Sequence, residues 1–433
     1  MTPGARLQAV IELLELIEPQ DAPADGILKH YFRKRRYAGS KDRRAVAEKF
    51  YTLLRHRARL GWWAERGGLE PRPRTRLLAD LALNEGLSAI EAGGLFGSGS
   101  YAPTPLSPEE ESFLSALSGQ SLPHPDMPEW VAGEYPDWLE DPLRKVFGED
   151  LEREVAALNE AAPVDLRINS AKTTREEAQD LLGGEGIETS PCPHAPMGLR
   201  LKNRANVTGT KAFQDGLVEI QDEGSQIVAL LTAVRPGMTA VDFCAGAGGK
   251  TLALAAIMEG QGRVHACDTD VSRLKRMTER LRRAQPGNVR SHTLVKNDPW
   301  ISEQTGEADR VLLDAPCSGS GVWRRAPEAK WRLTPEKLAG YCATQSQILE
   351  QAKGLVKPGG RLVFATCSIL REENEDQVER FLAVNPDFSL MDGAAVWADV
   401  LGRPCPVKGP MPRLGPATTF TDGFFCAVFE RTA

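Results

Sequence analysis

The stretch TAVDFCAGAGGKT, residues 239–251, joins an apolar run to a glycine-rich turn and the start of a helical pattern. It is not a nucleoside-triphosphate loop, because Cys244 stands where the spacing G-x-x-x-x-G-K-[ST] needs its first glycine. It also fails the dinucleotide motif G-x-G-x-x-G, since the sixth position is Thr251. The stretch therefore predicts a strand, a turn that faces a ligand, and a helix.

Apolar runs alternate regularly with helical patterns after Pro236-Gly237. This alternation is typical of right-handed crossovers in a doubly wound parallel sheet, so we expect an α/β catalytic domain over 236–433. The expected strands are 239–243, 263–268, 290–295, 310–315, 360–367 and the final FFCAVFE run. Two of the expected helices cover residues 270–284 and about 335–356, and two more begin near residues 249 and 372.

The first part of the chain has a different pattern. Apolar residues recur at helical spacing over 5–18, 41–60 and 74–84, which predicts an all-helical domain. A stretch rich in Gly, Ser and Pro over 93–128 marks its end. Strand-like runs such as VDLRINS then mix with helical ones, which predicts a small α+β subdomain. The expected domains are thus 1–128, 129–235 and 236–433.

Composition excludes several classes of protein. The 433 residues are 41% hydrophobic and 26% charged, with no apolar run near the length of a membrane span and no signal-peptide cleavage pattern. The eight cysteines are dispersed without a C-x-x-C pair, so neither a zinc site nor a disulfide framework is predicted. We expect a cytoplasmic protein that binds no membrane and no metal, and a monomer by default.

A basic segment contrasts with the net charge of −6. Between residues 29 and 59, twelve Lys and Arg residues are accompanied by only two acids, and aromatic residues are interleaved. This pattern is typical of a surface that contacts nucleic-acid phosphates. A solvated basic helix face has the same composition, so both interpretations stay open for this segment alone.

Ligands of such sheets bind beyond the carboxyl ends of the strands, so the residues directly after each strand form the candidate site. Glycines at 246, 248 and 249 allow a ligand to approach the backbone, and Asp268 can accept hydrogen bonds from both ribose hydroxyls. This arrangement suits either NAD or S-adenosylmethionine. The residues after the five strands are Cys244–Lys250, Asp268, Asp298, Asp314–Cys317 and Thr366–Ser368.

Two cysteines decide between these cofactors. With the first, fourth and fifth strands as neighbours, Cys317 and Cys367 emerge side by side at a strand spacing of about 5 Å. Hydride transfer has no use for paired thiols, whereas methylation of a pyrimidine at C5 needs a soft nucleophile at C6 and a second group that helps to expel it. Asp314 is placed to hold the N3/N4 edge of cytosine. Methylation of an exocyclic amine would instead use an [ND]-P-P-[YFW] turn, which the sequence DAPC does not match.

These motifs resemble the Sun/RsmB family of RNA cytosine-5 methyltransferases. The resemblance rests on FCAGAGGKT, ACDTD, LLDAPCSGSGVWRRAPEAKW, KPGGRLVFATCSILREENEDQV and TDGFFCAVFE, and it covers about residues 160–433. It implies a class I methyltransferase fold with a Rossmann-like sheet, S-adenosylmethionine as methyl donor, and RNA as substrate. The helical N-terminus, with its run YFRKRRYAGSKDRRA, resembles the NusB-like domain of bacterial ribosomal-RNA members, which implies an RNA-binding domain and linker over 1–128. The segment from DLRINSAKTTREEA to IQDEGSQIVALL resembles the family's small RNA-side subdomain, expected over 129–235.

The resemblance also implies roles for individual residues. Cys367 in ATCS would be the nucleophile, Cys317 in APCS would assist breakdown of the adduct, and Asp314 would reach the base. The glycine-rich turn Cys244–Lys250 departs from the family's usual C-A-A-P-G-G-K at Gly246 and Ala247, so we expect it to be less rigid.

The resemblance also implies a set of binding residues. The implied cofactor-binding set is Cys244, Ala245, Gly246, Ala247, Gly248, Gly249, Lys250, Asp268, Asp298 and Asp314. The expected RNA-binding set is Arg33, Lys34, Arg35, Arg36, Arg43, Arg44, Arg324 and Arg325, of which the last two belong to a basic-aromatic cluster from Trp323 to Trp331.

We therefore expect an enzyme that forms 5-methylcytosine in small-subunit ribosomal RNA through a bond between Cys367 and C6 of the base. Three alternatives stay open: transfer RNA as the substrate, a DNA cytosine-5 methyltransferase with Cys317 as its nucleophile, and an RNA-binding ribosome assembly factor. Separate replacement of the two cysteines distinguishes the RNA enzyme from the DNA enzyme. Binding of S-adenosylhomocysteine would exclude the assembly factor.

Overall fold

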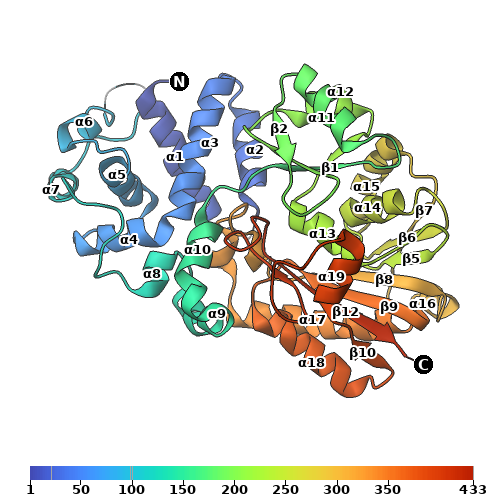
Figure 1. Cartoon of the computed structure of the whole chain (residues 1–433). Helices are drawn as coiled ribbons and strands as arrows, with labels where there is room; N and C mark the ends of the chain where they lie inside the picture. The colour runs from blue at the N-terminus through green and yellow to red at the C-terminus, as the bar shows by residue number, and fades with distance from the viewer. Residues whose placement is uncertain (21, 98, 100, 433) are drawn as a thin grey trace. The chain divides into compact units, whose positions relative to one another are not determined.

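The chain forms two compact units in the computed structural model, which describes residues 1–20, 22–97, 99 and 101–432 (Figure 1). One unit comprises Met1–Asn159 with Arg325–Leu333, and the other comprises Glu160–Arg324 with Thr334–Ala433. The first unit is helical, and the second contains the two sheets. Every helix in the described part of the chain is too short or too polar to span a bilayer.

The helical unit is built from amphipathic helices around one apolar core. In its first helix Val10, Leu13, Leu14 and Ile17 recur at helical spacing and are all buried. The single helix expected over 41–60 is instead two helices that meet at His56. The α-helices of this unit are α1 (Pro3–Ile17), α2 (Ala24–Lys34), α3 (Ser40–Arg55), α4 (Arg57–Arg66), α5 (Pro73–Leu83), α6 (Ala89–Gly93), α7 (Pro108–Ala116), α8 (Glu129–Gly133), α9 (Glu140–Phe147) and α10 (Leu151–Asn159).

The segment Arg325–Leu333 belongs to the helical unit although it lies far along the sequence. Trp331 packs against the core of that unit, and the guanidinium of Arg57 lies 5.3 Å from the centre of its ring. The Glu328 carboxylate accepts a hydrogen bond of 2.9 Å from the amide of Ala24, at the start of α2. The segment thus contributes both apolar and polar contacts to the helical unit.

Buried charges lie at the C-terminal end of this unit. Glu134 is fully buried, and its carboxylate accepts hydrogen bonds of 2.8 and 3.1 Å from the amides of Ala58 and Arg59, which open α4. Lys330 is also buried and donates to the side chain of Asn159. The helices α8, α9 and α10 belong to this unit, so it extends to Asn159, whereas the sequence placed the boundary at residue 128.

The second unit starts with a small antiparallel sheet. Its strands are β1 (Asp165–Ile168), β2 (Thr189–Pro191), β3 (Gly198–Leu201) and β4 (Val218–Ile220), and its helices are α11 (Arg175–Gly184) and α12 (Lys211–Gln214). The strand order is β2-β3-β1-β4. Leu166 and Ile168 of β1 belong to the apolar cluster that includes residues of both helices, whereas Arg167 between them pairs in register with Glu219 of β4. The sheet therefore has one apolar face and one charged face.

A larger sheet of eight strands follows. Its strands are β5 (Thr239–Asp242), β6 (Arg263–Asp268), β7 (Val289–Thr293), β8 (Ala308–Asp314), β9 (Val356–Thr366), β10 (Phe388–Leu390), β11 (Arg413–Leu414) and β12 (Phe424–Arg431). The order is β10-β12-β9-β8-β5-β6-β7, with β11 beside β12. Neighbours from β9 to β7 are parallel, and β10 and β12 are antiparallel, which confirms the expected α/β fold. The helices around it are α13 (Glu223–Leu231), α14 (Gly249–Ile257), α15 (Val271–Ala284), α16 (Pro299–Glu303), α17 (Pro335–Lys353), α18 (Glu375–Val384) and α19 (Gly393–Leu401).

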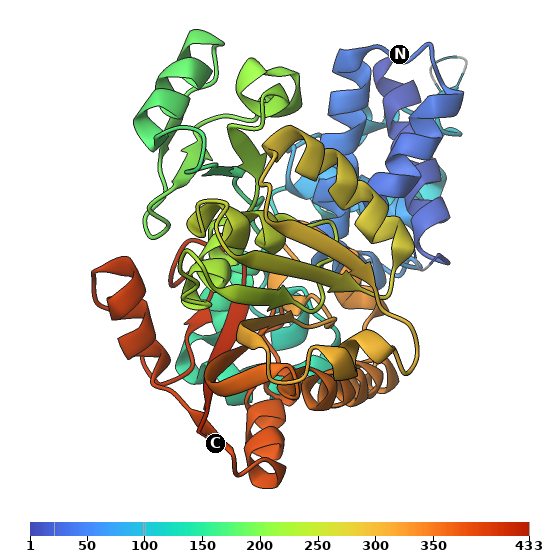
Figure 2. The same ribbon diagram turned by 90° about the vertical axis from the view of Figure 1, so that its right-hand side faces the viewer.

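Both faces of the large sheet are buried. Val363 and Ala365 of β9 belong to one apolar cluster, and the alternate residues Leu362 and Phe364 belong to another. Figure 1 shows α13 and α19 on one side of this sheet and α17 and α18 on the other. Figure 2 shows the parallel strands side by side, each rotated relative to its neighbour. Because both faces are covered, the loops after the strands are where the sheet meets a ligand.

Candidate active site

Cys317 and Cys367 lie in the turns that follow β8 and β9. The two strands are parallel neighbours whose register pairs Asp314 with Ala365, and a further hydrogen bond of 2.9 Å joins the Ala315 amide to the Ala365 carbonyl. The sulfur atoms of the two cysteines are 3.4 Å apart, and both side chains are partly exposed. The structure thus brings together the two thiols that the sequence places side by side.

A buried network holds the turn that carries Cys317. The Glu373 carboxylate accepts hydrogen bonds from the amide and hydroxyl of Ser318 at 2.8 and 2.5 Å. Gln345 of α17 donates to Glu373 and to the carbonyl of Pro316, each at 3.0 Å. Neither residue stands out in the sequence, because Glu373 precedes a helix, where an acid is normally solvated, and Gln345 lies within a helical pattern.

Asn374 holds the turn that carries Cys367. Its side-chain oxygen accepts a hydrogen bond of 2.5 Å from the Thr366 hydroxyl, and its amide nitrogen donates to the Ser368 carbonyl at 2.9 Å. The hydroxyl of Ser368 lies 3.0 Å from that of Ser320, on the other turn. Both cysteines are therefore carried on backbone that buried hydrogen bonds hold in place.

The environment of Cys317 favours its protonated form. The hydrogen bond with Cys367 raises the pKa of Cys317 well above its usual range, and burial adds to the shift. Cys317 therefore keeps its proton at neutral pH and can donate it to the Cys367 sulfur. Such a donor stabilises a neighbouring thiolate, which is the nucleophilic form of cysteine.

Lys250 and Asp314 form an ion pair at the same edge of the sheet. The ammonium is 2.6 Å from the carboxylate, and it lies 5.2 Å from the centre of the Phe424 ring. Burial alone would lower the pKa of Lys250, but the charge of Asp314 and the hydrogen bond to it outweigh burial and raise this pKa. Lys250 is therefore charged, and the structure joins two residues that the sequence places in separate motifs.

The glycine-rich turn uses backbone conformations that suit glycine. Gly246 and Gly248 have φ values of +55° and +82°. A Cβ at Gly248 would lie 2.4 Å from Met277 Cγ on α15, whereas a Cβ at Gly246 would meet nothing within 4 Å. Gly248 thus permits close packing on α15, and Gly246 leaves open space over the turn. Ala245 is buried, Ala247 and Gly249 are partly exposed, and Gly249 begins α14.

Asp268 connects the end of β6 to this turn. Its carboxylate accepts hydrogen bonds of 2.8 Å from the amide of Gly246 and from the amide of Asp270. Each oxygen keeps a lone pair, so the group can accept two further hydrogen bonds.

Burial raises the pKa of Cys244, which packs beside one of the sheet's apolar clusters. Cys244 is therefore a neutral packing residue as well as part of the turn.

Asp298 caps the short helix after β7. Its carboxylate accepts hydrogen bonds of 3.0 Å from the amides of Val295 and Trp300, and it lies 3.0 Å from the ring nitrogen of His292. The rings of His292 and Trp300 are stacked with their centres 5.2 Å apart. Trp300, which no sequence motif singles out, thus adds an aromatic surface beside Asp298.

The Lys and Arg residues between positions 33 and 44 are exposed, apart from Arg35. Arg35 pairs with Glu12 at 2.8 Å, and its guanidinium lies 3.7 Å from the centre of the Tyr31 ring. It stabilises the contact between α1 and α2. The exposed members of the expected RNA-binding set are Arg33, Lys34, Arg36, Arg43, Arg44 and Arg325.

The structure contradicts the expected RNA contact of Arg324. Its side chain is 6% exposed and lies 2.5 Å from Asp422 and 3.5 Å from Asp222. Trp323 is 2% exposed and Lys330 is 1% exposed, so most of this basic-aromatic cluster is buried. Aromatic and basic residues in alternation suit a buried ion-pair segment as well as a nucleic-acid surface, and the composition does not separate the two.

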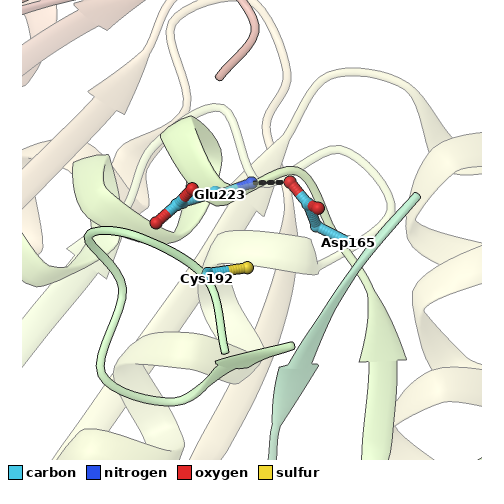
Figure 3. Close-up of side chains that lie close together, drawn as sticks. All are labelled: Asp165, Cys192 and Glu223. Atoms are coloured by element: carbon cyan, nitrogen blue, oxygen red, sulfur yellow. Dashed lines mark hydrogen bonds between the residues drawn. The ribbon is translucent and has the colours of Figure 1, made fainter. Parts of the chain in front are cut away.

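A group of three possible metal ligands lies beside the small sheet. The ligand atoms of Asp165, Cys192 and Glu223 are within 4.8 Å of one another (Figure 3). Arg200 donates to both oxygens of Asp165 at 2.7 and 2.9 Å and lies 3.4 Å from Glu223. Burial raises the pKa of Cys192, which favours the thiol over the thiolate that a metal would need. The guanidinium of Arg200 thus occupies the position beside the two carboxylates that a cation would take.

Known proteins share this arrangement of motifs. The model of the 16S rRNA methyltransferase RsmB/F family matches residues 229–430, and that of the RsmF/B-like ferredoxin-like domain matches residues 135–208. The probable ribosomal RNA small subunit methyltransferase B of Synechocystis is 33% identical over 299 residues, which is 69% of this chain and 67% of the relative. The ribosomal RNA small subunit methyltransferase B of Pasteurella multocida is 38% identical over 260 residues, 59% of this chain and 58% of the relative. The solved structure of PH0851 superposes with a TM-score of 0.74 at 28% identity, over 99% of each chain.

The matches confirm the resemblance inferred from the motifs. They include the glycine-rich turn and both cysteine turns, which lie within residues 229–430. The chain spans 67% and 58% of the lengths of the two curated relatives. The chain therefore belongs to the RsmB/F family of 16S rRNA methyltransferases.

Proposed function

We propose that this protein is an S-adenosylmethionine-dependent enzyme that forms 5-methylcytosine in small-subunit ribosomal RNA. The observation that carries the proposal is the 3.4 Å distance between the sulfurs of Cys317 and Cys367. Membership of the family supports methyl transfer to ribosomal RNA. The paired thiols support C5 of a pyrimidine as the target, because that carbon reacts only after a nucleophile has added to the ring.

The residues around the glycine-rich turn fit S-adenosylmethionine. Its ribose hydroxyls are hydrogen-bond donors, and the buried Asp268 carboxylate has acceptor capacity beyond its two amide bonds. Gly246 leaves open space next to that carboxylate. When bound, the cofactor supplies an electrophilic methyl group. In this proposal the turn from Cys244 to Lys250, Asp268, Asp298 and Asp314 would hold it.

Cys367 acts as the nucleophile. Its sulfur lies next to the protonated Cys317, whose S–H can stabilise a thiolate. The thiolate adds to C6 of cytosine, which forms a C–S bond and moves electron density to C5 and to the N3 edge of the ring. The Lys250 ammonium offsets this charge, and the Asp314 carboxylate accepts a hydrogen bond from the N4 amine.

Cys317 acts after methyl transfer. Its high pKa results from the hydrogen bond with Cys367, from burial and from the charge of Cys367. Once the Cys367 sulfur is bonded to carbon it carries no charge, so one of these contributions is lost, and in this proposal the thiol passes its proton to water. The Cys317 thiolate then takes the proton from C5. The electrons of the C5–H bond form the C5–C6 double bond, and Cys367 leaves as a thiolate.

The exposed part of the basic run supports RNA as the partner. Arg33, Lys34, Arg36, Arg43 and Arg44 lie on the surface of the helical unit, where they can contact phosphates without reading sequence. We propose that the enzyme acts in the cytoplasm, where small subunits are assembled.

Bisulfite sequencing of total RNA from a strain that lacks the protein, compared with its parent, tests the substrate. We expect a 5-methylcytosine signal in small-subunit ribosomal RNA to disappear, to return with the wild-type gene, and to stay absent with Cys367→Ala. Loss of signal in transfer RNA instead would assign that substrate. No loss in any RNA would contradict the proposal, and failure of the purified protein to bind S-adenosylhomocysteine in calorimetry would favour an assembly factor.

A further inference from the structure

Arg280 of α15 contacts two parts of the second unit. Its Nε donates a hydrogen bond of 3.0 Å to the Glu219 carboxylate on β4 of the small sheet, and Nη2 lies 3.0 Å from the same oxygen. Its Nη1 donates to the carbonyl of Ala247, also at 3.0 Å. One guanidinium therefore joins the small sheet to the glycine-rich turn.

The burial of these groups makes the connection rigid. The Glu219 side chain is 4% exposed and that of Arg280 is 21% exposed, so the ion pair is largely shielded from water. An ideal Cβ at Gly249 would lie 3.7 Å from Nη1 of Arg280, which places the guanidinium directly against the turn. A charged donor on a carbonyl is among the stronger hydrogen bonds in proteins.

Arg280 restrains the centre of the glycine-rich turn, between amides that other hydrogen bonds hold. Ala247 lies between Gly246 and Gly248, both at positive φ, and no proline fixes the backbone. The amide of Gly248 closes a tight turn on the carbonyl of Ala245 at 2.8 Å. The carbonyl of Ala247 points away from that turn toward Arg280, so this hydrogen bond sets the orientation of the peptide group between residues 247 and 248.

Arg283, one turn further along α15, offers an internal comparison. It also pairs with the Glu219 carboxylate, and its guanidinium lies 4.0 Å from the centre of the Phe213 ring. The Arg283 guanidinium thus contacts Glu219 and Phe213, both in the part of the chain that forms the small sheet. The Arg280 guanidinium contacts Glu219 and also the carbonyl of Ala247 in the glycine-rich turn. The two arginines thus share one partner and differ in the contact with Ala247.

We propose that Arg280 is a positioning residue for the cofactor turn, and that Glu219 acts through it. The inference rests on the proposed function, because it assigns the turn to S-adenosylmethionine. Arg280 holds the peptide between residues 247 and 248 in the orientation that receives the cofactor. Glu219 in turn holds the Arg280 guanidinium against the turn, because the ion pair between them is largely buried.

Calorimetry with S-adenosylhomocysteine and steady-state methyl transfer on the full-length protein test this inference. We expect Arg280→Gln to raise the Kd for S-adenosylhomocysteine and the KM for S-adenosylmethionine about 10-fold, with kcat changed less than about twofold. Glu219→Gln should shift both in the same direction by a smaller factor. Arg283→Gln is the matched control, with an expected change in Kd below about twofold.

The outcomes separate this inference from the proposed function. Equal Kd values for the Arg280→Gln and Arg283→Gln proteins would overturn the positioning role alone, even if both variants are less stable than the wild type. A wild-type protein that binds S-adenosylhomocysteine but methylates no RNA would overturn the proposed function alone, and one that binds no S-adenosylhomocysteine would overturn both. If Arg280→Gln does not fold, Arg280→Lys replaces it with the same expected direction, because a lysine cannot donate to Glu219 and Ala247 through one planar group.

Discussion

The Lys250 ammonium lies 2.6 Å from the Asp314 carboxylate, although one residue opens the helix after β5 and the other ends β8. The Lys250 side chain is 9% exposed and that of Asp314 is 29% exposed. A charge with so little water around it is stable only beside an opposite charge. The pair therefore fixes both the packing of the glycine-rich turn and the polarity of the site beside Cys317.

Replacement of either partner of this pair should affect stability and activity differently. Asp314→Asn leaves the buried Lys250 ammonium without its counter-charge, so we expect the free energy of unfolding to fall by about 3–5 kcal/mol. The double variant Lys250→Met with Asp314→Asn removes both charges and should recover most of that loss. Activity should remain at least about 100-fold below the wild type in all variants. Urea unfolding and methyl-transfer assays measure the two effects. A double variant that is no more stable than Asp314→Asn would contradict the ion pair.

The two cysteines should fail in different ways. Cys367→Ala removes the nucleophile, so no covalent complex with RNA should form. Cys317→Ala leaves the nucleophile but slows expulsion, so a covalent complex should accumulate and migrate as a shifted band in denaturing electrophoresis. Cys405→Ala, a partly exposed cysteine outside both turns, is the control and should behave as wild type. A covalent complex with Cys367→Ala instead would assign the nucleophile to Cys317.

Stability should depend on pH through Asp242. This residue is fully buried, one oxygen accepts a hydrogen bond of 2.7 Å from Thr251, and the other has no partner among the described residues. Burial raises the pKa of Asp242 to about 7. The folded protein therefore holds this proton more tightly than the unfolded chain does. The stability that Asp242 contributes to the folded state is present at low pH and is lost as pH rises from about 4 to about 7. The free energy of unfolding should fall by about 1.4 kcal/mol per pH unit over that range.

Urea unfolding at pH 5.5 and pH 8 checks this dependence. The ratio of folded to unfolded protein should fall with pH for the wild type, and the fall should be smaller for Asp242→Asn, which cannot ionise. A variant whose stability changes with pH as steeply as that of the wild type would show that another group is responsible.

Arg324 should behave as a structural residue. Its guanidinium is buried between Asp422 and Asp222, so Arg324→Ala should lower the free energy of unfolding by about 3–5 kcal/mol. The dependence of RNA affinity on salt should not change, because no phosphate contact is lost. Thermal unfolding and RNA binding at several salt concentrations separate the two roles. If the variant is as stable as the wild type and its RNA affinity depends less on salt, Arg324 contacts RNA after all.

Charge removal on the helical surface should have the opposite effect. Arg33, Lys34 and Arg36 are exposed, so replacing all three by Gln should change thermal stability little. RNA affinity should fall, and the slope of log affinity against log salt should decrease by up to about two to three if all three contact phosphates. Unchanged affinity would instead identify this segment as a solvated basic face.

The sequence predicted the large sheet except for the short strands β10 and β11, because most of its strands are buried on both faces. The expected strand 263–268 coincides with β6 (Arg263–Asp268), and the expected helix 270–284 nearly coincides with α15 (Val271–Ala284). The regular alternation of strand-like runs with helical patterns made this assignment possible, because a short apolar run alone does not distinguish a strand from a buried helix. The helical region was harder to divide, since the pattern over 41–60 continues across His56 and only tertiary packing separates α3 from α4.

The paired cysteines were predictable because each lies in the turn after a strand and the strand order places these turns together. The burial of Arg324 could not be predicted from the sequence. The contacts of Arg324 come from Asp222 and Asp422, about 100 residues away on either side, and no local pattern reveals such partners. The same reason hides Glu373, Gln345 and Arg280, whose contacts depend on how distant segments pack.

The helical unit is discontinuous in sequence, because Arg325–Leu333 completes it from within the stretch between β8 and α17. A truncated gene that ends at Asn159 would therefore encode a product without Trp331 in its core and without Lys330 beside Asn159. Residues 1–159 by themselves are thus an incomplete form of the helical unit, which needs the segment between the two cysteine turns to be whole.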